Sequence, residues 1–260
     1  MTHISFSELK NWGRCAFYHK LTYIDKIRLF QGNEHTAFGT AVHDVCERLL
    51  MKEDFKPEEY FLDRFRAELK RLPENLEIKK KLAVDMKQQG EDLLPHIMPA
   101  VDEYFDDYEV VSTEEPIMIP ITEFEDAEYK FKGFIDLVLK TKDGRYHIID
   151  WKTCSWGWDA RRRVDVMVIY QLIYYKHYYA QKHGIDPDKI DVHFGLLKRT
   201  AKKNHIELFK ITSGKKRTEN AIKFLVNALY NINTKKYVKN KLACHGPFGP
   251  CEFYKTEHCT

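Results

Sequence analysis

The sequence predicts an α/β or α+β domain in which helices flank a central mixed sheet, with a helical N-terminal part and a cysteine-rich C-terminal tail. Hydrophobic residues make up 43% and charged residues 31% of the 260, a composition typical of a globular protein. Helical and strand patterns follow one another in an order that suits such a sheet. No internal repeat and no linker rich in glycine or serine interrupts them, so we expect a single domain over residues 1–260.

The first part of the chain is predicted to be mainly helical. Ser5 precedes apolar residues and caps a short helix over residues 5–15. A second helix is expected over 36–51, because small and branched apolar side chains recur there every four residues. Residues 57–108 continue as helices that start at the PEEY and PENLE segments. Two prolines, Pro95 and Pro99, are expected to break or kink them.

The middle of the chain has the pattern of strands. Short β-branched segments occur at 110–111 and 117–121, and apolar residues alternate over 129–139. Lys142-Asp143-Gly144 supplies a hairpin turn before a further strand at 145–153. These segments predict a run of strands joined by a tight hairpin.

The rest of the chain alternates again between the two patterns. A long helix is predicted from about 164 to 183, then strands at 191–197 and 205–211, and a basic helix at 216–231. The predicted domain therefore has three parts: a helical part (1–108), a sheet core (109–212), and a basic helix with the cysteine tail (213–260).

The net charge of +3 hides two opposed blocks. Residues 97–128 hold eleven acidic side chains and no lysine or arginine, whereas residues 196–241 hold thirteen basic side chains against two acidic ones. The basic block is suited to a polyanion, because lysine and arginine that neutralise phosphates release counterions. A solvated helix face that balances the acidic block is the alternative, and composition does not separate the two.

Two aspartates and a lysine mark the candidate active site. Asp136 lies in Gly-Phe-Ile-Asp and Asp150 follows Ile148-Ile149, so each carboxylate sits in an apolar strand where a charge needs compensation. The hairpin would bring both acids to the same end, and oxygen ligands of this kind suit Mg²⁺ or Mn²⁺. Lys152 lies on the strand face of Asp150, where it could orient a water or offset charge on a phosphate. A surface ion pair is the alternative interpretation.

Two helical pairs add to this pattern. His43 follows Gly39 by one helical turn and is followed by Glu47, so the histidine could supply a nitrogen ligand to the same metal. Gln171 and Tyr175 are likewise one turn apart, and their amide and phenol could contact a phosphate, a base or the lysine. As isolated residues, all of these would be ordinary packed or surface groups.

Together these segments resemble the RecB-like branch of the PD-(D/E)XK nuclease superfamily, which includes CRISPR-associated exonucleases, AddB-type nucleases and many phage exonucleases. The resemblance runs from the start of the chain to its cysteine tail, and it rests on motifs in the family's order: ISFSELKNWGRCAFYHK, FGTAVH, GFID, IIDWKT and QLIYY. It implies a restriction-endonuclease-like core and hydrolysis of DNA by a metal-activated water.

The resemblance also implies roles for individual residues. His43, Asp136 and Asp150 would bind the metal together with the backbone carbonyl of Trp151. Lys152 would be the catalytic lysine. Gln171 and Tyr175 would line the active-site cleft, and Glu114 or Glu115 would be an additional acid of the family.

Six cysteines occur in a chain with no secretory segment, so free thiols or metal ligands are expected rather than disulfides. In the iron–sulfur members of the family, one N-terminal and three C-terminal cysteines hold a [4Fe–4S] cluster. The residues placed for that role here are Cys15, Cys244, Cys251 and Cys259. Their tail spacing is wider than the usual one, and histidines adjoin two of them, so a structural Zn²⁺ remains the alternative. The other two, Cys46 and Cys154, are predicted to be buried.

Aromatic and basic residues follow the catalytic segment. Trp156 and three consecutive arginines (Arg161, Arg162 and Arg163) are predicted to bind DNA, because aromatic faces stack on unpaired bases and arginines contact phosphates. A surface loop whose tryptophans pack inward is the alternative.

The predicted function is a metal-dependent DNA nuclease, in particular an exonuclease on single-stranded DNA or DNA ends. A catalytically silent DNA-binding or scaffold module is an alternative, and so is an RNA- or spacer-processing nuclease. No Walker-type phosphate loop occurs, so a helicase or recombination partner would be a separate chain. Without an apolar run of about 20 residues or a signal peptide, we expect no membrane association and a cytoplasmic protein, in the host cytoplasm if phage-encoded.

Overall fold

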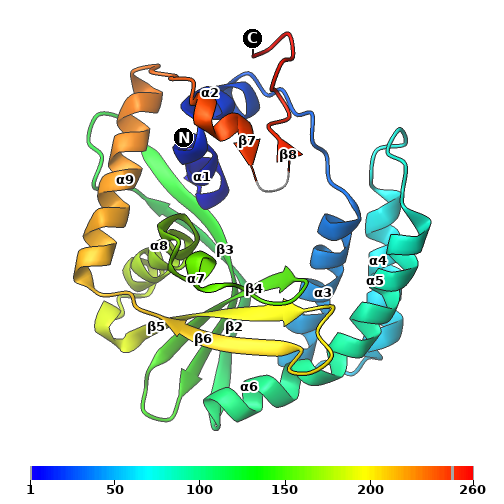
Figure 1. Ribbon diagram of the computed structural model, residues 1–260. Helices are drawn as coiled ribbons and strands as arrows, with labels where there is room; N and C mark the ends of the chain where they lie inside the picture. Colours follow the sequence, from blue (N-terminus) through cyan, green and yellow to red (C-terminus); the bar gives the residue numbers. More distant parts are fainter. Residues whose placement is uncertain (1, 247–248, 260) are drawn as a thin grey trace. The chain divides into compact units, whose positions relative to one another are not determined.

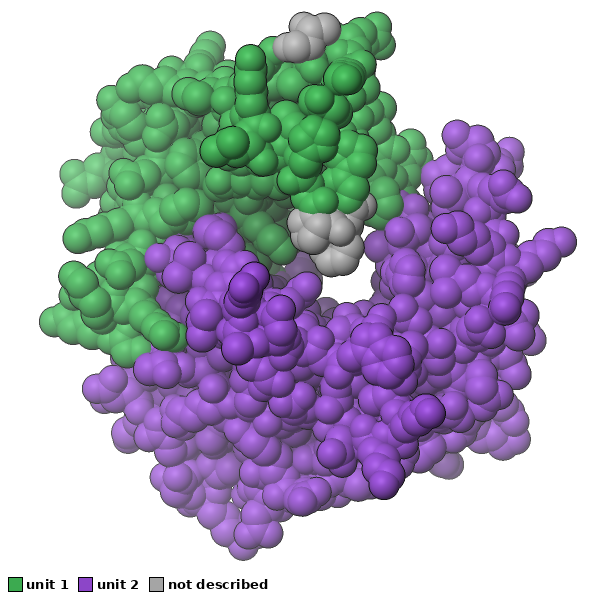
Figure 2. Space-filling view, in the orientation of Figure 1, with its two compact units in different colours: residues 1–31, 117–133, 214–260 green, residues 32–116, 134–213 purple. Residues whose placement is uncertain are grey.

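The computed structural model describes residues 2–246 and 249–259 (Figure 1). The chain forms two compact units. Unit 1 consists of residues 1–31, 117–133 and 214–260, and unit 2 of residues 32–116 and 134–213 (Figure 2). The residues predicted to carry catalysis all belong to unit 2, and the four predicted cluster cysteines all belong to unit 1.

The sheet of unit 2 has the strand order β3-β4-β5-β6. Its strands are β3 (Tyr129–Thr141), β4 (Tyr146–Cys154), β5 (Ile190–Lys198) and β6 (Ile206–Ile211). The pairs β3–β4 and β5–β6 are antiparallel, whereas β4 and β5 are parallel. This confirms the predicted mixed sheet. Every residue of β5 is buried, as expected of a central strand.

Helices cover both faces of this sheet. The parallel crossover from β4 to β5 contains α7 (Ala160–Val164), α8 (Val166–His183) and the short turn η3 (Pro187–Lys189). Tyr146 of β4 packs against Tyr179 of α8. Trp151 lies five positions after Tyr146 on β4, so its side chain points to the opposite face of the sheet. It lies in the apolar core that includes the other helices of unit 2.

These other helices are α3 (Glu34–Leu50), α4 (Pro57–Lys70), α5 (Lys80–Leu93), the turn η2 (Leu94–His96) and α6 (Ile97–Phe105). Asn33 caps α3 with a capping box, and the helix begins at Glu34, two residues before the predicted start. Helix α4 begins at Pro57 as predicted, but the PENLE segment is a turn and α5 starts only at Lys80. Pro99 does not break a helix, because it lies in the first turn of α6 where its missing N–H is not needed.

Strand β2 (Tyr108–Pro120) is a single strand of 13 residues that pairs with β3. Two separate short strands were predicted here, because the alternation of apolar residues is interrupted in the middle. The burial pattern explains the interruption. Val110 and Ser112 are half-buried on one side, and the next buried residue, Glu115, follows three positions later instead of two. Glu114 has a positive φ of 45° at this point, so the strand contains a β-bulge.

Unit 1 joins the N-terminal segment to the C-terminal one. Strand β1 (Thr2–Ser5), which the sequence did not predict, pairs in parallel with the first residues of β3. Ser5 caps α1 (Phe6–Arg14), as predicted. The remaining elements are α2 (Ala16–His19), the π-helical turn η1 (Lys20–Ile24), α9 (Lys215–Asn233), η4 (Lys241–Cys244), β7 (His245–Gly246) and β8 (Gly249–Pro250). Trp12 of α1 packs edge-on against Phe224 of α9.

Candidate active site

Asp150 and Lys152 form a close ion pair on β4. The Nζ atom of Lys152 lies 2.5 Å from Oδ2 of Asp150, whose side chain is 1% exposed, whereas the lysine is 32% exposed. Oδ2 makes no well-directed hydrogen bond to any group in the described part of the chain. A carboxylate with an unsatisfied buried oxygen beside an accessible ammonium is suited to hold a cation and a phosphate together.

Asp136 joins β3 to β4 where their backbone ladder ends. The paired register runs from Lys140↔Tyr146 to Leu137↔Ile149. Beyond it, the Asp136 side chain accepts a 2.7 Å hydrogen bond at Oδ2 from the backbone N–H of Trp151. The aspartate therefore fixes the segment that carries both Asp150 and Lys152.

His43, Glu114 and Asp136 come together from three elements. Each offers one ligand atom, and these atoms all lie within 4.8 Å of one another, the one such group of three found among the described residues. Nδ1 of His43 is 3.8 Å from Oδ2 of Asp136. One imidazole and two carboxylates are a donor set that fits a hard divalent cation such as Mg²⁺ or Mn²⁺.

Two glycines lie behind this group, and one of them is required by the packing. A Cβ atom on Gly39 of α3 would meet the Thr153 hydroxyl of β4 at 3.4 Å, which is an ordinary contact distance. A Cβ atom on Gly195 of β5 would lie 2.3 Å from the indole ring of Trp151. Nothing in the local sequence pattern around Gly195 shows that it faces the tryptophan.

The bulge in β2 decides which of the two adjacent glutamates reaches the site. Glu114 belongs to the ligand group, and its side chain is exposed. Glu115 is 7% exposed, and its carboxylate contacts the end of α8 instead of the ligand group. Its Oε1 accepts hydrogen bonds from Lys182 Nζ at 2.7 Å and pairs with His183 Nε2 at 2.6 Å, and Ser112 donates to Oε2 at 2.5 Å. Glu115 thus binds the end of α8 to the bulge that presents Glu114.

The electrostatics of the site favour a bound cation. Although Glu114 is exposed, the protein atoms around its carboxyl group partly desolvate it, and this effect, followed by the negative charges of Asp136 and Glu47, raises its pKa to about 7. Burial raises the pKa of Asp150 to about 6 and also raises that of Asp136, although Lys152 opposes both shifts. Burial and the charge of Lys152 lower the pKa of His43 to about 4, so its imidazole is neutral and able to bind a metal.

Gln171 and Tyr175 lie next to this group rather than in it. Gln171 donates a 3.1 Å hydrogen bond to the Tyr175 hydroxyl, and the same hydroxyl accepts the backbone N–H of Phe134. Tyr175 is 6% exposed. The two residues therefore hold β3 in place two positions before Asp136. The metal-binding role of the Trp151 carbonyl stays a prediction. The contact observed for the Trp151 backbone is the hydrogen bond that its N–H donates to Asp136.

The predicted DNA-binding residues differ in their surroundings. Trp156 is 74% exposed, whereas Trp158 is buried. The guanidinium of Arg162 lies 4.9 Å from the Trp158 ring centroid, and Arg163 forms a 2.7 Å ion pair with Glu207. Arg161 is exposed. Within the described residues, Arg163 is the one of the three arginines that forms an ion pair, and Arg161 and Arg162 are exposed.

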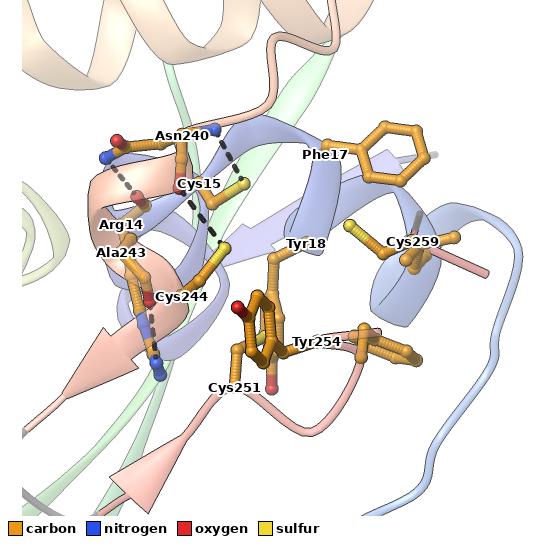
Figure 3. A pocket seen from close by; sticks show the side chains of 12 residues that line it. Arg14, Cys15, Phe17, Tyr18, Asn240, Ala243, Cys244, Cys251, Tyr254 and Cys259 are labelled. Atoms are coloured by element: carbon orange, nitrogen blue, oxygen red, sulfur yellow. Dashed lines mark hydrogen bonds between the residues drawn. The ribbon is translucent and has the colours of Figure 1, made fainter. Parts of the chain in front are cut away.

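In unit 1, the four predicted cluster cysteines line one pocket (Figure 3). Asn240 donates its backbone N–H to the Cys15 sulfur at 3.3 Å, and the Cys244 thiol donates to the Asn240 carbonyl at 3.9 Å. Tyr18 and Phe253 form part of the apolar wall. The four cysteines are Cys15, Cys244, Cys251 and Cys259, and each is partly buried and free of disulfides. Of the other two thiols in the chain, Cys46 is buried as predicted, but Cys154 is only partly buried.

Within residues 2–246 and 249–259, no helix has the length and apolar character required to cross a membrane.

The chain matches a known protein family and is similar in fold to a solved structure. Residues 3–253 match the model of a family described as the PD-(D/E)XK nuclease superfamily. No curated protein matches the chain. Among solved structures, the fold is similar to that of a "putative exonuclease" from Eubacterium rectale, with 15% identity, a TM-score of 0.58, and coverage of 93% of this chain and 85% of that one. A protein named SSO0001 aligns with 12% identity, a TM-score of 0.42, and coverage of 88% and 76%. The family match spans nearly the whole sequence, and the chain therefore belongs to the PD-(D/E)XK nuclease superfamily.

Proposed function

We propose that this protein is a Mg²⁺- or Mn²⁺-dependent deoxyribonuclease that acts as an exonuclease on single-stranded DNA or DNA ends. The observation that carries the proposal is the convergence of His43, Glu114 and Asp136 beside the Asp150–Lys152 pair. An imidazole, three carboxylates and one ammonium at the end of a β-hairpin meet the chemical needs of metal-assisted phosphodiester hydrolysis.

In this proposal His43, Glu114, Asp136 and Asp150 hold the cation, together with the Trp151 carbonyl. When bound, such a cation polarises a phosphoryl oxygen and lowers the pKa of a water molecule. Lys152 lies against Asp150 on one side and is open to solvent on the other. Its ammonium group can therefore donate a hydrogen bond to the attacking water or to a phosphate oxygen and offset the charge that develops there.

A time course on end-labelled oligonucleotides tests the proposal. The substrates are single- and double-stranded DNA labelled at either end, incubated with and without Mn²⁺, and a single-stranded RNA of the same sequence. We expect Mn²⁺-dependent release of short products from DNA, and loss of this activity in Asp150→Asn and Lys152→Ala. Lys142→Ala is a matched control, because Lys142 also pairs with an aspartate but lies in the turn at the other end of the hairpin. Equal activity in all variants would refute the site, and cleavage of RNA alone would refute the substrate.

We also propose that Cys15, Cys244, Cys251 and Cys259 hold a [4Fe–4S] cluster. Four thiols around one pocket supply the ligands that such a cluster requires. A tetrahedral zinc site, with Zn–S bonds of about 2.3 Å, needs sulfurs only about 3.8 Å apart. The same four thiols could also close around a single zinc ion, so the metal that the protein binds distinguishes the two sites.

Metal analysis of anaerobically purified protein tests the cluster. We expect about four irons and four sulfides per chain and a broad visible absorption band, all lost in Cys251→Ser. Cys154→Ser is the matched control, because Cys154 is also a partly buried free thiol but does not line the pocket. A colourless protein with one zinc per chain would refute the cluster and support the zinc site.

A further inference from the structure

Phe134 is an exposed aromatic residue on the strand that carries Asp136. It is 49% exposed, although its neighbour Ile135 is fully buried. Residues two apart on a strand point to the same face and lie about 6–7 Å apart. The phenyl ring of Phe134 therefore stands on the same face of β3 as the side chain of Asp136, which belongs to the ligand group.

The Phe134 ring is open to solvent, but its backbone is held by a hydrogen bond. In the part of the chain that the structure describes, Phe134 takes part in no aromatic pair and no cation–π contact, whereas the fully buried Phe38 and Phe61 pack against each other. Its N–H donates to the Tyr175 hydroxyl, which also accepts from Gln171. Because the backbone of Phe134 is already fixed and its ring is already exposed, stacking of a flat ligand on the ring should cost little conformational entropy.

The position of the ring identifies its ligand. A phosphodiester bound at the carboxylates carries its own bases, and the exposed Phe134 ring is an apolar surface two residues from Asp136 on β3. Stacking of a base on an aromatic side chain contributes substantially to single-strand binding and tolerates any base, because every base has a π-face. Inside a duplex, both faces of a base are already covered by its neighbours, so an unpaired base is the form that fits.

We propose that Phe134 stacks on the unpaired base next to the scissile phosphate and makes this site selective for single strands and frayed ends. The inference rests on the proposed nuclease function and adds a specificity residue to it. It also gives Gln171 and Tyr175 a positioning role, because their hydrogen bonds hold the strand segment that bears the ring.

Abasic substrates test the proposal directly. A single-stranded oligonucleotide is compared with a series in which one of the four terminal nucleotides at either end is abasic. We expect the wild-type protein to cleave one member of the series about ten- to a hundredfold more slowly than the intact strand. Phe134→Ala should cleave both at the same slow rate, and Phe134→Trp should restore the difference. Phe30→Ala, which removes a ring that is 57% exposed in unit 1, is the control and should keep the wild-type pattern.

A binding measurement separates stacking from chemistry. With Ca²⁺ in place of Mn²⁺, the fluorescence of a terminal 2-aminopurine should be quenched by the wild-type protein and by Phe134→Trp, but much less by Phe134→Ala. A Phe134→Ala protein that still discriminates against the abasic strand would overturn the stacking role and leave the nuclease function intact. A wild-type protein that neither cleaves nor binds DNA would overturn both.

Discussion

The Asp136 carboxylate accepts the backbone N–H of Trp151 at 2.7 Å, and this bond replaces the next rung of the ladder between β3 and β4. Asp136 therefore has two tasks, since the same oxygen lies 3.8 Å from His43 in the ligand group. The hydrogen bond to Trp151 stabilises the fold, and the position beside His43 is suited to metal binding. Two substitutions at this position should separate them.

Asp136→Asn should lose activity without losing stability. The amide oxygen can still accept the Trp151 N–H, but a neutral amide is a much weaker ligand for a divalent cation. We expect a decrease in kcat/KM of more than about a hundredfold and a free energy of unfolding close to that of the wild type. Asp136→Ala should lose both, with a loss of about 1–3 kcal/mol for the unpaired N–H. Equal free energies of unfolding for the two variants would show that the hydrogen bond from Trp151 to Asp136 does not stabilise the fold.

Removing Lys152 should be partly compensated by removing the charge of Asp150. Lys152→Ala leaves a carboxylate that is 1% exposed without its counter-ion, so we expect a marked loss of stability at pH 8. The double variant with Asp150→Asn should recover about 1–3 kcal/mol of that loss while remaining inactive. A double-mutant cycle from urea unfolding measures the coupling. Additive effects would show that the pair contributes nothing to the fold.

The two adjacent glutamates should give opposite results on stability. Glu114 is crowded by other carboxylates, so Glu114→Gln should raise the melting temperature of the metal-free protein at pH 8 while abolishing the stabilisation by Mn²⁺. Glu115→Gln should lower the melting temperature, because Lys182 and His183 lose their buried partner. Thermal melts with and without Mn²⁺ provide the measurement. Lower melting temperatures for both variants without metal would contradict the assignment of Glu114.

The sequence predicts most of the fold because hydrophobic periodicity is local. The strands around Asp136 and Asp150 and the helices around His43 and Gln171 were all predicted within a few residues of their observed bounds. The sequence could not choose between Glu114 and Glu115, since the choice depends on a bulge in the pairing of β2. A bulge is an extra residue in one strand relative to its partner, so it shifts the alternation by one residue and depends on how the two strands pair.

Contacts between distant strands were also beyond the sequence. The ring of Trp151 lies in the core over Gly195, 44 positions later in the chain. The register of the parallel pair β4–β5 brings these two residues together. Similarly, the local pattern gave no reason to pair the histidines of the same two strands.

These histidines provide the last prediction. His147 Nδ1 lies 3.1 Å from His193 Nε2, and the pair is buried against Phe105 of α6. Burial, and then the neighbouring His147, lower the pKa of His193 to about 3 from its usual value near 6.5. Between these two values the unfolded chain binds a proton that the folded protein does not, so the free energy of unfolding must fall as the pH falls from about 6.5 towards 3.

The expected loss is large enough to measure. One such histidine contributes up to about 1.4 kcal/mol per pH unit inside this window, which amounts to roughly 2 kcal/mol between pH 7.5 and pH 5. Urea unfolding of the wild type and His193→Gln at both pH values isolates the contribution, since all other titrating groups are shared. The variant should show a smaller decrease on acidification, whereas His3→Gln, a change at an exposed histidine of β1, should follow the wild type. Parallel decreases for the wild type and His193→Gln would mean that His193 is already protonated in the folded protein at pH 5.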